Sequence, residues 1–440
     1  MHVVTTSQLP ITHWTNERSI IFENHLKLCA NKRRMKSKEK SIKKGVLCLC
    51  LMTLVSSCTN TDMSERHLFV ESLFTGAEQY EWLNRLATVF PNHRIRRGEY
   101  SFRFPIGDVL TLPNNYRYRD QYQSTSNYLE ETDTAALLIV HKGAIRYESY
   151  WLTGAEDVHW MSFSVGKSFL SAMIGIALHE GHIGSIEEAI TTYVPELKGS
   201  AYDGVRIKDI LQMSSGAGWN EDYSDPDSDI VRFAGAWANG DSLDDFTASL
   251  VREKEPGTFN YYNSMDTQAL GMMMVRATGM TLSKYAEQKL WQPLGMEQDA
   301  YWVTDNEGME MAAGGLQLIA RDYAKLGQLY LQKGNWRGNQ LVPESWVADS
   351  VTPDAPHLMA EAHPDYPLSY GYQWWIPPGD EGEYCALGVY NQAIYVNPAR
   401  DLVIVKLSAN SNYGLTNTEE SYREFEGFEL FRAIGRALEG

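Results

Sequence analysis

The sequence predicts an α+β fold in which an antiparallel sheet is flanked by N- and C-terminal helices and interrupted by an inserted, mostly helical subdomain. Two β-like runs lie near residues 135–151 and two more near 385–408, whereas residues 181–292 carry mostly helix and loop signals. Strands from both chain ends can then form one sheet, with the helical section inserted between them. A ligand cleft is expected between the two parts.

The individual elements follow from periodicity and from turn residues. The runs Ala135–His141 and Ala144–Trp151 surround Lys142-Gly143, which is a hairpin signal. A second hairpin is expected from 392–397 and 402–408, and residues 92–133 are expected to be irregular covering structure. Helices are expected at 77–89, 164–181, 205–215, 242–252, 268–278, 282–291, 320–333 and 420–438.

Length and composition set the broad class. A chain of 440 residues with 43% hydrophobic and 22% charged residues has enough apolar material for a large core. Its formal net charge is −17. Because phosphate binding requires a basic surface, this charge argues against nucleic acid as a partner.

The amino end predicts a secretion signal followed by a lipid anchor. Lysines follow Met35, and an apolar run from Gly45 to Val55 follows the lysines. That run is too short to span a bilayer but suits a signal-peptide core. Ser56-Ser57-Cys58 resembles a bacterial lipoprotein cleavage site, which would make Cys58 the lipidated first residue of the mature chain. The alternative is an ordinary membrane-proximal or disordered leader.

These signals divide the chain into four parts. Residues 1–34 are interpreted as an upstream extension from a mis-assigned start, 35–57 as the signal peptide, 58–75 as a tether and 76–440 as the folded domain. The expected location is the bacterial cell envelope, on the periplasmic side of the inner or outer membrane. The lipid on Cys58 would make the membrane a partner.

The main chemical candidate is Ser164-x-x-Lys167 at the start of the predicted buried helix. Residues three apart on a helix share a face, and a desolvated lysine can take the proton of a serine hydroxyl. A helix start also offers free N–H groups for an oxyanion. The pattern alone is weak, since Ser37-x-x-Lys40 and Ser41-x-x-Lys44 in the basic leader match it as well.

A second candidate is Tyr261-Tyr262-Asn263, which has the form Tyr-x-Asn. Taken alone, the motif is better explained structurally, with Asn263 as a helix N-cap and Tyr261 as an ordinary core aromatic. The motif gains weight only together with Ser164 and Lys167.

Together these motifs resemble the serine β-lactamase and penicillin-binding-protein superfamily, which carries the Ser-x-x-Lys motif. More narrowly, the chain resembles the class C β-lactamase-related hydrolases that include 6-aminohexanoate-dimer hydrolases and family VIII esterases. The resemblance implies a β-lactamase/transpeptidase-like fold, a serine hydrolase and no cofactor or metal. It runs from about Thr134 to Asn410 through Phe163–Ser168, Ile210–Gly216, Phe259–Asn263, Gly314–Leu316 and Tyr370–Trp375.

The resemblance also implies roles. Ser164 would be the nucleophile that accepts the acyl group, and Lys167 would be its base. Tyr261 would relay protons to the leaving group and to the hydrolytic water, and Asn263 would position Lys167 and the substrate. The remaining expected contacts are Gly388 in the third motif, the backbone N–H of Val389 as part of the oxyanion hole, and Tyr223 on a substrate-covering loop. The alternative for Tyr223 is a tyrosine in a surface turn.

The third motif departs from the better-known members of the superfamily. Ala386-Leu387-Gly388 stands where β-lactamases and peptidases carry Lys-Thr/Ser-Gly, so the anchor for a substrate carboxylate is absent. We therefore expect an uncharged, fairly open site for small-molecule esters or linear amides. The alternatives are β-lactamase or D-Ala-D-Ala carboxypeptidase-type activity, and a catalytically weak envelope binding protein of the same fold.

Other chemistries lack their signatures. The sequence has no Gly-x-Ser-x-Gly elbow of an α/β-hydrolase. His179-Glu180-Gly181-His182 does not have the spacing of a zinc helix and is expected to be a solvated helix end. The acidic run Glu221–Asp229 lacks calcium-loop spacing and is expected to be a solvated loop.

Overall fold

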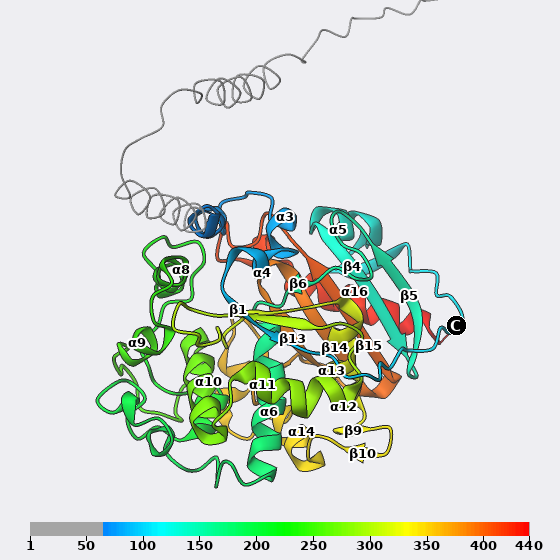
Figure 1. The fold of residues 1–440 in the computed structure, drawn as a ribbon. Coiled ribbons are helices and arrows are strands. Elements are labelled where there is room, and N and C mark those ends of the chain that lie inside the picture. The colour runs from blue at the N-terminus through cyan, green and yellow to red at the C-terminus, as the bar shows by residue number, and fades with distance from the viewer. Residues whose placement is uncertain (1–64, 440) are drawn as a thin grey trace, which may run out of the picture. The chain divides into compact units, whose positions relative to one another are not determined.

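The computed structural model describes residues 65–439, and its largest element is a seven-stranded antiparallel sheet in the order β11-β12-β13-β14-β15-β4-β5 (Figure 1). Strand β15 pairs with β4, with Ile404 opposite Ile139, so strands from the two chain ends share one sheet as predicted. The strands are β4 (Thr134–His141), β5 (Ala144–Tyr150), β11 (Ser369–Tyr370), β12 (Trp375–Ile376), β13 (Tyr384–Gly388), β14 (Gln392–Asn397) and β15 (Leu402–Ser408).

Both predicted hairpins are present. Lys142 and Gly143 have φ angles of 52° and 73°, and a two-residue turn with positive φ at both positions matches the twist of the strands that it joins. Strands β14 and β15 form the second hairpin. Hydrophobic side chains fill both faces of the sheet, so the sheet is buried between layers.

Helices cover the two faces. The helix α16 (Glu424–Ala437) packs Phe428, Phe431 and Ile434 against one face. On the other face lies α13 (Ala320–Leu331), which approaches so closely that a Cβ on Gly327 would stand 2.6 Å from a methyl of Val403. The predicted closing helix is therefore present, although Arg423, with a φ of 53°, separates it from the short α15 (Glu419–Tyr422).

A second, four-stranded sheet lies in the order β1-β7-β8-β6 and leads the chain into the Ser164 region. Its strands are β1 (Asn92–Ile95), β6 (Trp160–Met161), β7 (Ala300–Val303) and β8 (Leu316–Leu318). Residues 92–133, expected to be irregular, also hold the hairpin β2 (Asn115–Tyr118) and β3 (Gln121–Ser124) and the helix α5 (Thr125–Glu131). Short strands with mixed burial leave little periodicity to read.

Residues 181–292 consist of helices and loops, as predicted, and Figure 1 shows α8, α9 and α10 gathered on one side of the sheet. This section and its continuation contain α7 (Ile207–Leu211), α8 (Asp229–Asn239), α9 (Leu243–Ala248), α10 (Ser264–Thr278), α11 (Leu282–Ala286), a π-helical turn Glu287–Trp291 and α12 (Gln292–Leu294). The hairpin β9 (Asn335–Trp336) and β10 (Asn339–Gln340) and the helix α14 (Glu344–Ser350) follow α13.

Two predictions near the amino end are wrong. The tether over 58–75 is already structured from residue 65, because residues 65–72 are helical and Phe69 is fully buried in the core. The helix over 77–89 is two short helices, α3 (Tyr80–Leu83) and α4 (Leu86–Val89). Cys58, the signal peptide 35–57 and residues 1–34 lie outside the described residues, so lipid anchoring stays a prediction.

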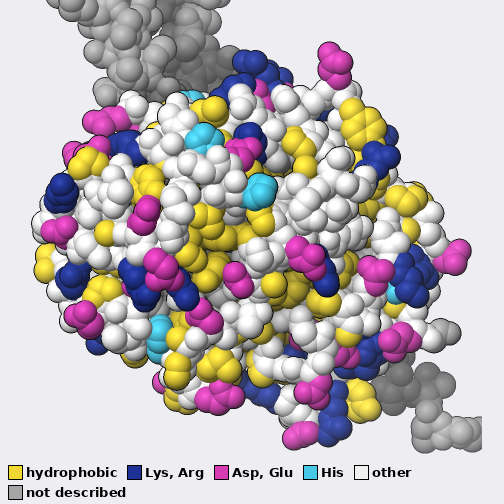
Figure 2. Space-filling model, turned by 90° about the horizontal axis from the view of Figure 1, so that it is seen from below, with side chains coloured by type: hydrophobic (Ala, Val, Ile, Leu, Met, Phe, Trp, Pro, Cys, Tyr) yellow, Lys and Arg dark blue, Asp and Glu magenta, His cyan; other side chains and the backbone are white. Residues whose placement is uncertain are grey.

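No helix among residues 65–439 has the length and apolarity needed to cross a bilayer. On the face shown in Figure 2, basic and acidic side chains are interspersed over the surface without a continuous basic patch.

Candidate active site

Ser164 lies at the N-cap of the buried helix α6 (Val165–His179), directly after a strained turn. Phe163 before it has a φ of 43°, a left-handed conformation that non-glycine residues rarely adopt. A Cβ on Gly314 would stand 3.0 Å from the Phe163 backbone, so this turn is held by tight packing. The turn places the Ser164 hydroxyl at the surface of a cleft while the helix behind it stays in the core.

Lys167 contacts the Ser164 hydroxyl directly. Its Nζ lies 3.0 Å from Ser164 Oγ, 3.2 Å from Ser264 Oγ and 2.5 Å from the carbonyl oxygen of Ala313. The side chain is 2% exposed. Burial lowers the pKa of Lys167 to about 8, against a smaller upward effect of the Glu221 charge. A lysine with this pKa is partly neutral near physiological pH and can accept a proton.

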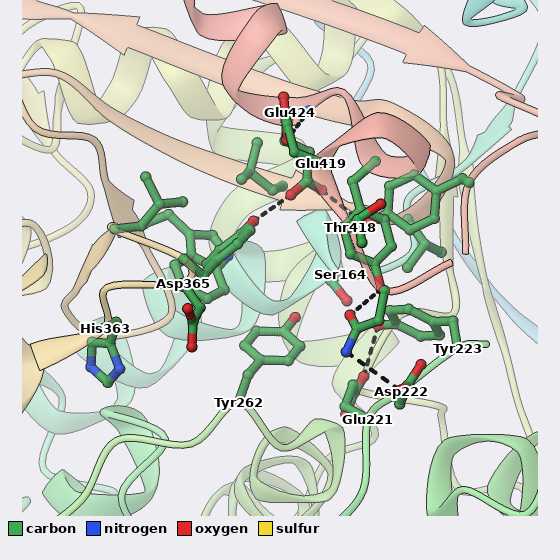
Figure 3. Close-up of a pocket in the computed structure, with 18 of the residues that line it drawn as sticks. Ser164, Glu221, Asp222, Tyr223, Tyr262, His363, Asp365, Thr418, Glu419 and Glu424 are labelled. Carbon is green, nitrogen blue, oxygen red and sulfur yellow. Dashed lines mark hydrogen bonds between the residues drawn. The ribbon is translucent and has the colours of Figure 1, made fainter. Parts of the chain in front are cut away.

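The tyrosine that faces Ser164 is Tyr262, one residue after the predicted Tyr261. Figure 3 shows the Tyr262 hydroxyl directed toward Ser164, and its ring lies 5.3 Å from Lys167 Nζ. Tyr261 is instead 46% exposed and stacks on Phe259. Burial raises the pKa of Tyr262 well above its ordinary value, and a hydrogen bond with Ser164 partly offsets this. Tyr262 therefore keeps its proton.

The physical reason for this correction is the extended backbone before α10. Asn263 has φ −143° and ψ 109°, and in extended backbone alternate side chains point to opposite sides. Tyr262 and Ser264 therefore share the side that faces Lys167. Asn263 caps α10, with its side-chain oxygen accepting a hydrogen bond of 2.8 Å from the Met265 amide. The contact with Lys167 expected of Asn263 is made by Ser264.

Glu221 is a member of this cluster that the sequence analysis missed. Its carboxylate accepts hydrogen bonds from the Ser264 hydroxyl at 2.7 Å, the Ser264 amide at 3.0 Å and the Tyr223 hydroxyl at 2.9 Å, and from Trp219 Nε1. The prediction that the acidic run 221–229 is only a solvated loop is wrong for its first residue. The spacing Trp-x-Glu-x-Tyr was the available signal, because it places two donors around one carboxylate.

Gly388 ends β13 against the nucleophile. A Cβ there would stand 2.7 Å from the Ser162 carbonyl oxygen and 3.2 Å from the Ser164 amide nitrogen, so only glycine allows this approach. Val389 follows and lines the cleft beside Ser164, and the oxyanion-hole role of its backbone N–H stays a prediction. Leu387 also lines the cleft, which confirms that the third motif offers an apolar side chain in place of an anchor.

Two cavities meet at Ser164, and Tyr223, Glu221 and Val389 line both of them. One has a volume of about 550 Å³ and is lined by Tyr261, Tyr262 and side chains of the C-terminal segment. The other, of about 530 Å³, is mostly apolar and is lined by residues of 67–75 and of α8, among them Phe74, Ile230, Phe233 and Trp237. A substrate bound across Ser164 can therefore extend in two directions.

The first cavity is acidic, which corrects the expectation of an uncharged site. Its described lining includes no Lys or Arg, one histidine, His363, and the carboxylates of Glu221, Asp222, Asp365, Glu419 and Glu424 (Figure 3). Glu424 accepts hydrogen bonds from the hydroxyls of Tyr366 and Tyr413, and burial raises its pKa to about 7. A substrate carboxylate would meet repulsion here.

Among residues 65–439, no group of three or more His, Cys, Asp or Glu side chains is placed so that it could hold a metal ion. Glu180, part of the His-Glu-Gly-His run, is the C-cap of α6 and binds Tyr285 and Lys289. The run therefore ends a helix, as the sequence analysis expected.

Comparison with known proteins places this geometry among serine hydrolases. The family model described as "Beta-lactamase" matches residues 125–426. A 6-aminohexanoate-dimer hydrolase from Paenarthrobacter ureafaciens is 33% identical over 294 residues, which are 64% of this chain and 74% of that protein.

Solved structures share the fold. A provisionally named 6-aminohexanoate-dimer hydrolase from Bacillus anthracis has a TM-score of 0.70 at 24% identity, covering 81% of this chain and 93% of its own. A family VIII carboxylesterase has a TM-score of 0.53 at 14% identity, covering 71% and 95%. The mixed helix and antiparallel-sheet architecture is thus that of the β-lactamase and penicillin-binding-protein fold.

Proposed function

The chain belongs to the β-lactamase family of hydrolases, and we propose that it cleaves ester or linear amide bonds through an acyl-enzyme on Ser164. The observation that carries this proposal is the 3.0 Å contact between Lys167 Nζ and Ser164 Oγ, made by a lysine whose pKa burial lowers to about 8. Nucleophile and base are then within hydrogen-bond reach, as covalent catalysis by serine requires.

In the proposed first step, Ser164 Oγ attacks the substrate carbonyl carbon while Lys167 Nζ takes the hydroxyl proton. The backbone amides of Ser164 and Val389 hold the oxyanion. The bond to the leaving oxygen or nitrogen then breaks, the protonated Tyr262 gives its proton to the leaving group, and the proton that Lys167 took from Ser164 passes to Tyr262. In the second half of the cycle a water molecule attacks the acyl carbon while Lys167 takes its proton, and the bond to Ser164 Oγ breaks as that proton returns to the serine.

The lining of the site supports esters and linear amides over anionic substrates. β-Lactams and D-Ala-D-Ala peptides present a carboxylate, and here the third motif offers Ala386 and Leu387 while the adjoining cavity carries carboxylates. Two cavities on either side of Ser164 suit an extended chain with the scissile bond in its middle. The relative from Paenarthrobacter ureafaciens is named for a 6-aminohexanoate dimer.

A substrate panel tests this function. Short-chain p-nitrophenyl esters, a linear amide joining two alkyl chains, a β-lactam and a D-Ala-D-Ala peptide are compared at equal concentration. We expect turnover of the esters or the linear amide and at most weak turnover of the two carboxylate-bearing compounds. Efficient hydrolysis of the β-lactam or the peptide would favour β-lactamase or carboxypeptidase activity. If the protein turns over none of the substrates and is not labelled by a fluorophosphonate, the result would favour a binding protein of the same fold.

The position of the proton donor gives a matched pair of substitutions. Tyr262→Phe removes the hydroxyl that faces Ser164 and is expected to lower kcat by about 10²- to 10⁴-fold, the usual contribution of general acid–base catalysis. Tyr261→Phe, which loses only an exposed hydroxyl, should leave kcat nearly unchanged. Steady-state kinetics on one ester decides the assignment, and the reverse ranking would return the role to Tyr261.

A further inference from the structure

The hydrogen bonds of Glu221 run in one fixed direction. The amide of Ser264 and the indole N–H of Trp219 can only donate, and both meet Oε2. The hydroxyls of Ser264 and Tyr223 meet Oε1 at 2.7 and 2.9 Å. An ionised carboxylate carries no proton and has room for four acceptor contacts. All four partners are therefore donors, and the Ser264 hydroxyl proton points to Glu221.

This direction limits what Ser264 can do toward Lys167. A hydroxyl has a single proton, and that of Ser264 is committed to Glu221. Across the 3.2 Å contact with Lys167 Nζ, Ser264 can therefore only accept. The Ala313 carbonyl, 2.5 Å from the same nitrogen, is also only an acceptor.

The same count fixes the orientation of the reactive base. A neutral lysine amine has two N–H bonds and one lone pair. The two acceptors, Ser264 and Ala313, take the two N–H bonds, and the lone pair remains for the third neighbour, Ser164 Oγ at 3.0 Å. That is the arrangement in which Lys167 accepts the serine proton.

We infer that Glu221 is a positioning residue that holds the lone pair of Lys167 on Ser164, acting through the hydroxyl of Ser264. The inference rests on the proposed function, because it assigns Lys167 as the base. Glu221 touches neither reacting atom; it keeps the Ser264 hydroxyl an acceptor, and that acceptor turns one N–H of Lys167 away from Ser164. Without it, the Ser264 proton can turn to the Lys167 lone pair and compete with Ser164.

The test is Glu221→Gln. Because Oε2 faces two N–H groups that only donate, the amide oxygen must take that place, and the amide NH₂ then donates to the Ser264 hydroxyl. This frees the Ser264 proton to bind Lys167. We expect kcat to fall about 10²-fold, the lower range of a lost proton transfer, with little change in KM.

A pH profile separates this role from a structural one. In the wild-type enzyme kcat/KM should rise with pH through the Lys167 pKa of about 8, because the neutral amine is the active form. The Glu221 charge stabilises the ammonium, so its removal lowers the Lys167 pKa and should move the rising limb to lower pH. A variant that is only destabilised should keep the wild-type pH at which kcat/KM rises.

Two further variants complete the experiment. Asp227→Asn makes the same charge change at an exposed position on the same loop and should keep the wild-type kcat and pH limb. Ser264→Ala removes the acceptor through which Glu221 acts and should lower kcat, by no more than Glu221→Gln does, because alanine has no proton that competes for the Lys167 lone pair. In the double variant the kcat effect of Glu221→Gln should shrink to within about a factor of two to three.

The outcomes are distinct. The inference is overturned if Glu221→Gln keeps both the wild-type kcat and the wild-type pH dependence of kcat/KM. It is also overturned if Ser264→Ala keeps the wild-type kcat. Either result leaves the proposed function intact. If Glu221→Gln does not fold, as judged by circular dichroism, Ser264→Ala decides alone. Failure of the proposed function itself is recognised separately, because the wild-type protein would then neither turn over esters nor label with fluorophosphonate.

Discussion

Replacing Ser164 with alanine is expected to lower kcat by roughly 10⁶-fold, as loss of the nucleophile does in another serine hydrolase. The substitution removes only the hydroxyl group. Ser164 is the N-cap of α6 without a side-chain capping bond, so the helix does not depend on it. Folding and substrate binding should therefore persist while acyl transfer is lost. Steady-state hydrolysis of a p-nitrophenyl ester measures the change.

Covalent labelling gives an independent reading of the same variant. A fluorophosphonate probe should label the wild-type protein and leave Ser164→Ala unlabelled. Ser249→Ala is the control, because Ser249 is exposed and its hydroxyl only donates to the carbonyl of Phe246. Retained turnover or retained labelling in Ser164→Ala would refute Ser164 as the nucleophile.

Much of the fold follows from local sequence signals. Apolar runs around Lys142-Gly143 and between 392 and 408 predicted strands to within one residue of their bounds, since buried strands need continuous apolar side chains. The short strands between 92 and 124 were not predicted, because four residues with mixed burial show no hydrophobic periodicity. Phe69 in a polar segment could not be recognised as core without its distant partners Phe90 and Trp237.

The site was predictable only in part, and register explains the difference. Ser164 and Lys167 are one helical turn apart, so local geometry brings them together. The doublet Tyr261-Tyr262 offers two hydroxyls, and the choice between them depends on which side of an extended segment faces Lys167. Glu221 reaches Ser264 through tertiary folding alone. The acidic cavity arises likewise, from segments far apart in the chain.

Removing the base should be nearly as severe as removing the nucleophile. Lys167→Ala is expected to lower kcat by about 10⁵- to 10⁶-fold, because nucleophile and base act as a unit. Lys167→Met fills the same buried space without an amine and should lose as much, which separates lost proton transfer from a packing defect. The rise of kcat/KM through pH 8 should disappear in both variants.

A double variant tests most strictly whether Ser164 and Lys167 act as a unit. If Lys167 acts only by activating Ser164, the double variant Ser164→Ala with Lys167→Met should be no slower than Ser164→Ala alone, since one missing partner already stops acyl transfer. A small primary amine should restore part of the rate to Lys167→Ala, because the vacated space adjoins Ser164 Oγ, and it should not rescue Ser164→Ala. Activity of Lys167→Met within tenfold of wild type would show that another group takes the serine proton. Of the groups around Ser164, Tyr262 would then be the first to test, although its raised pKa argues against it.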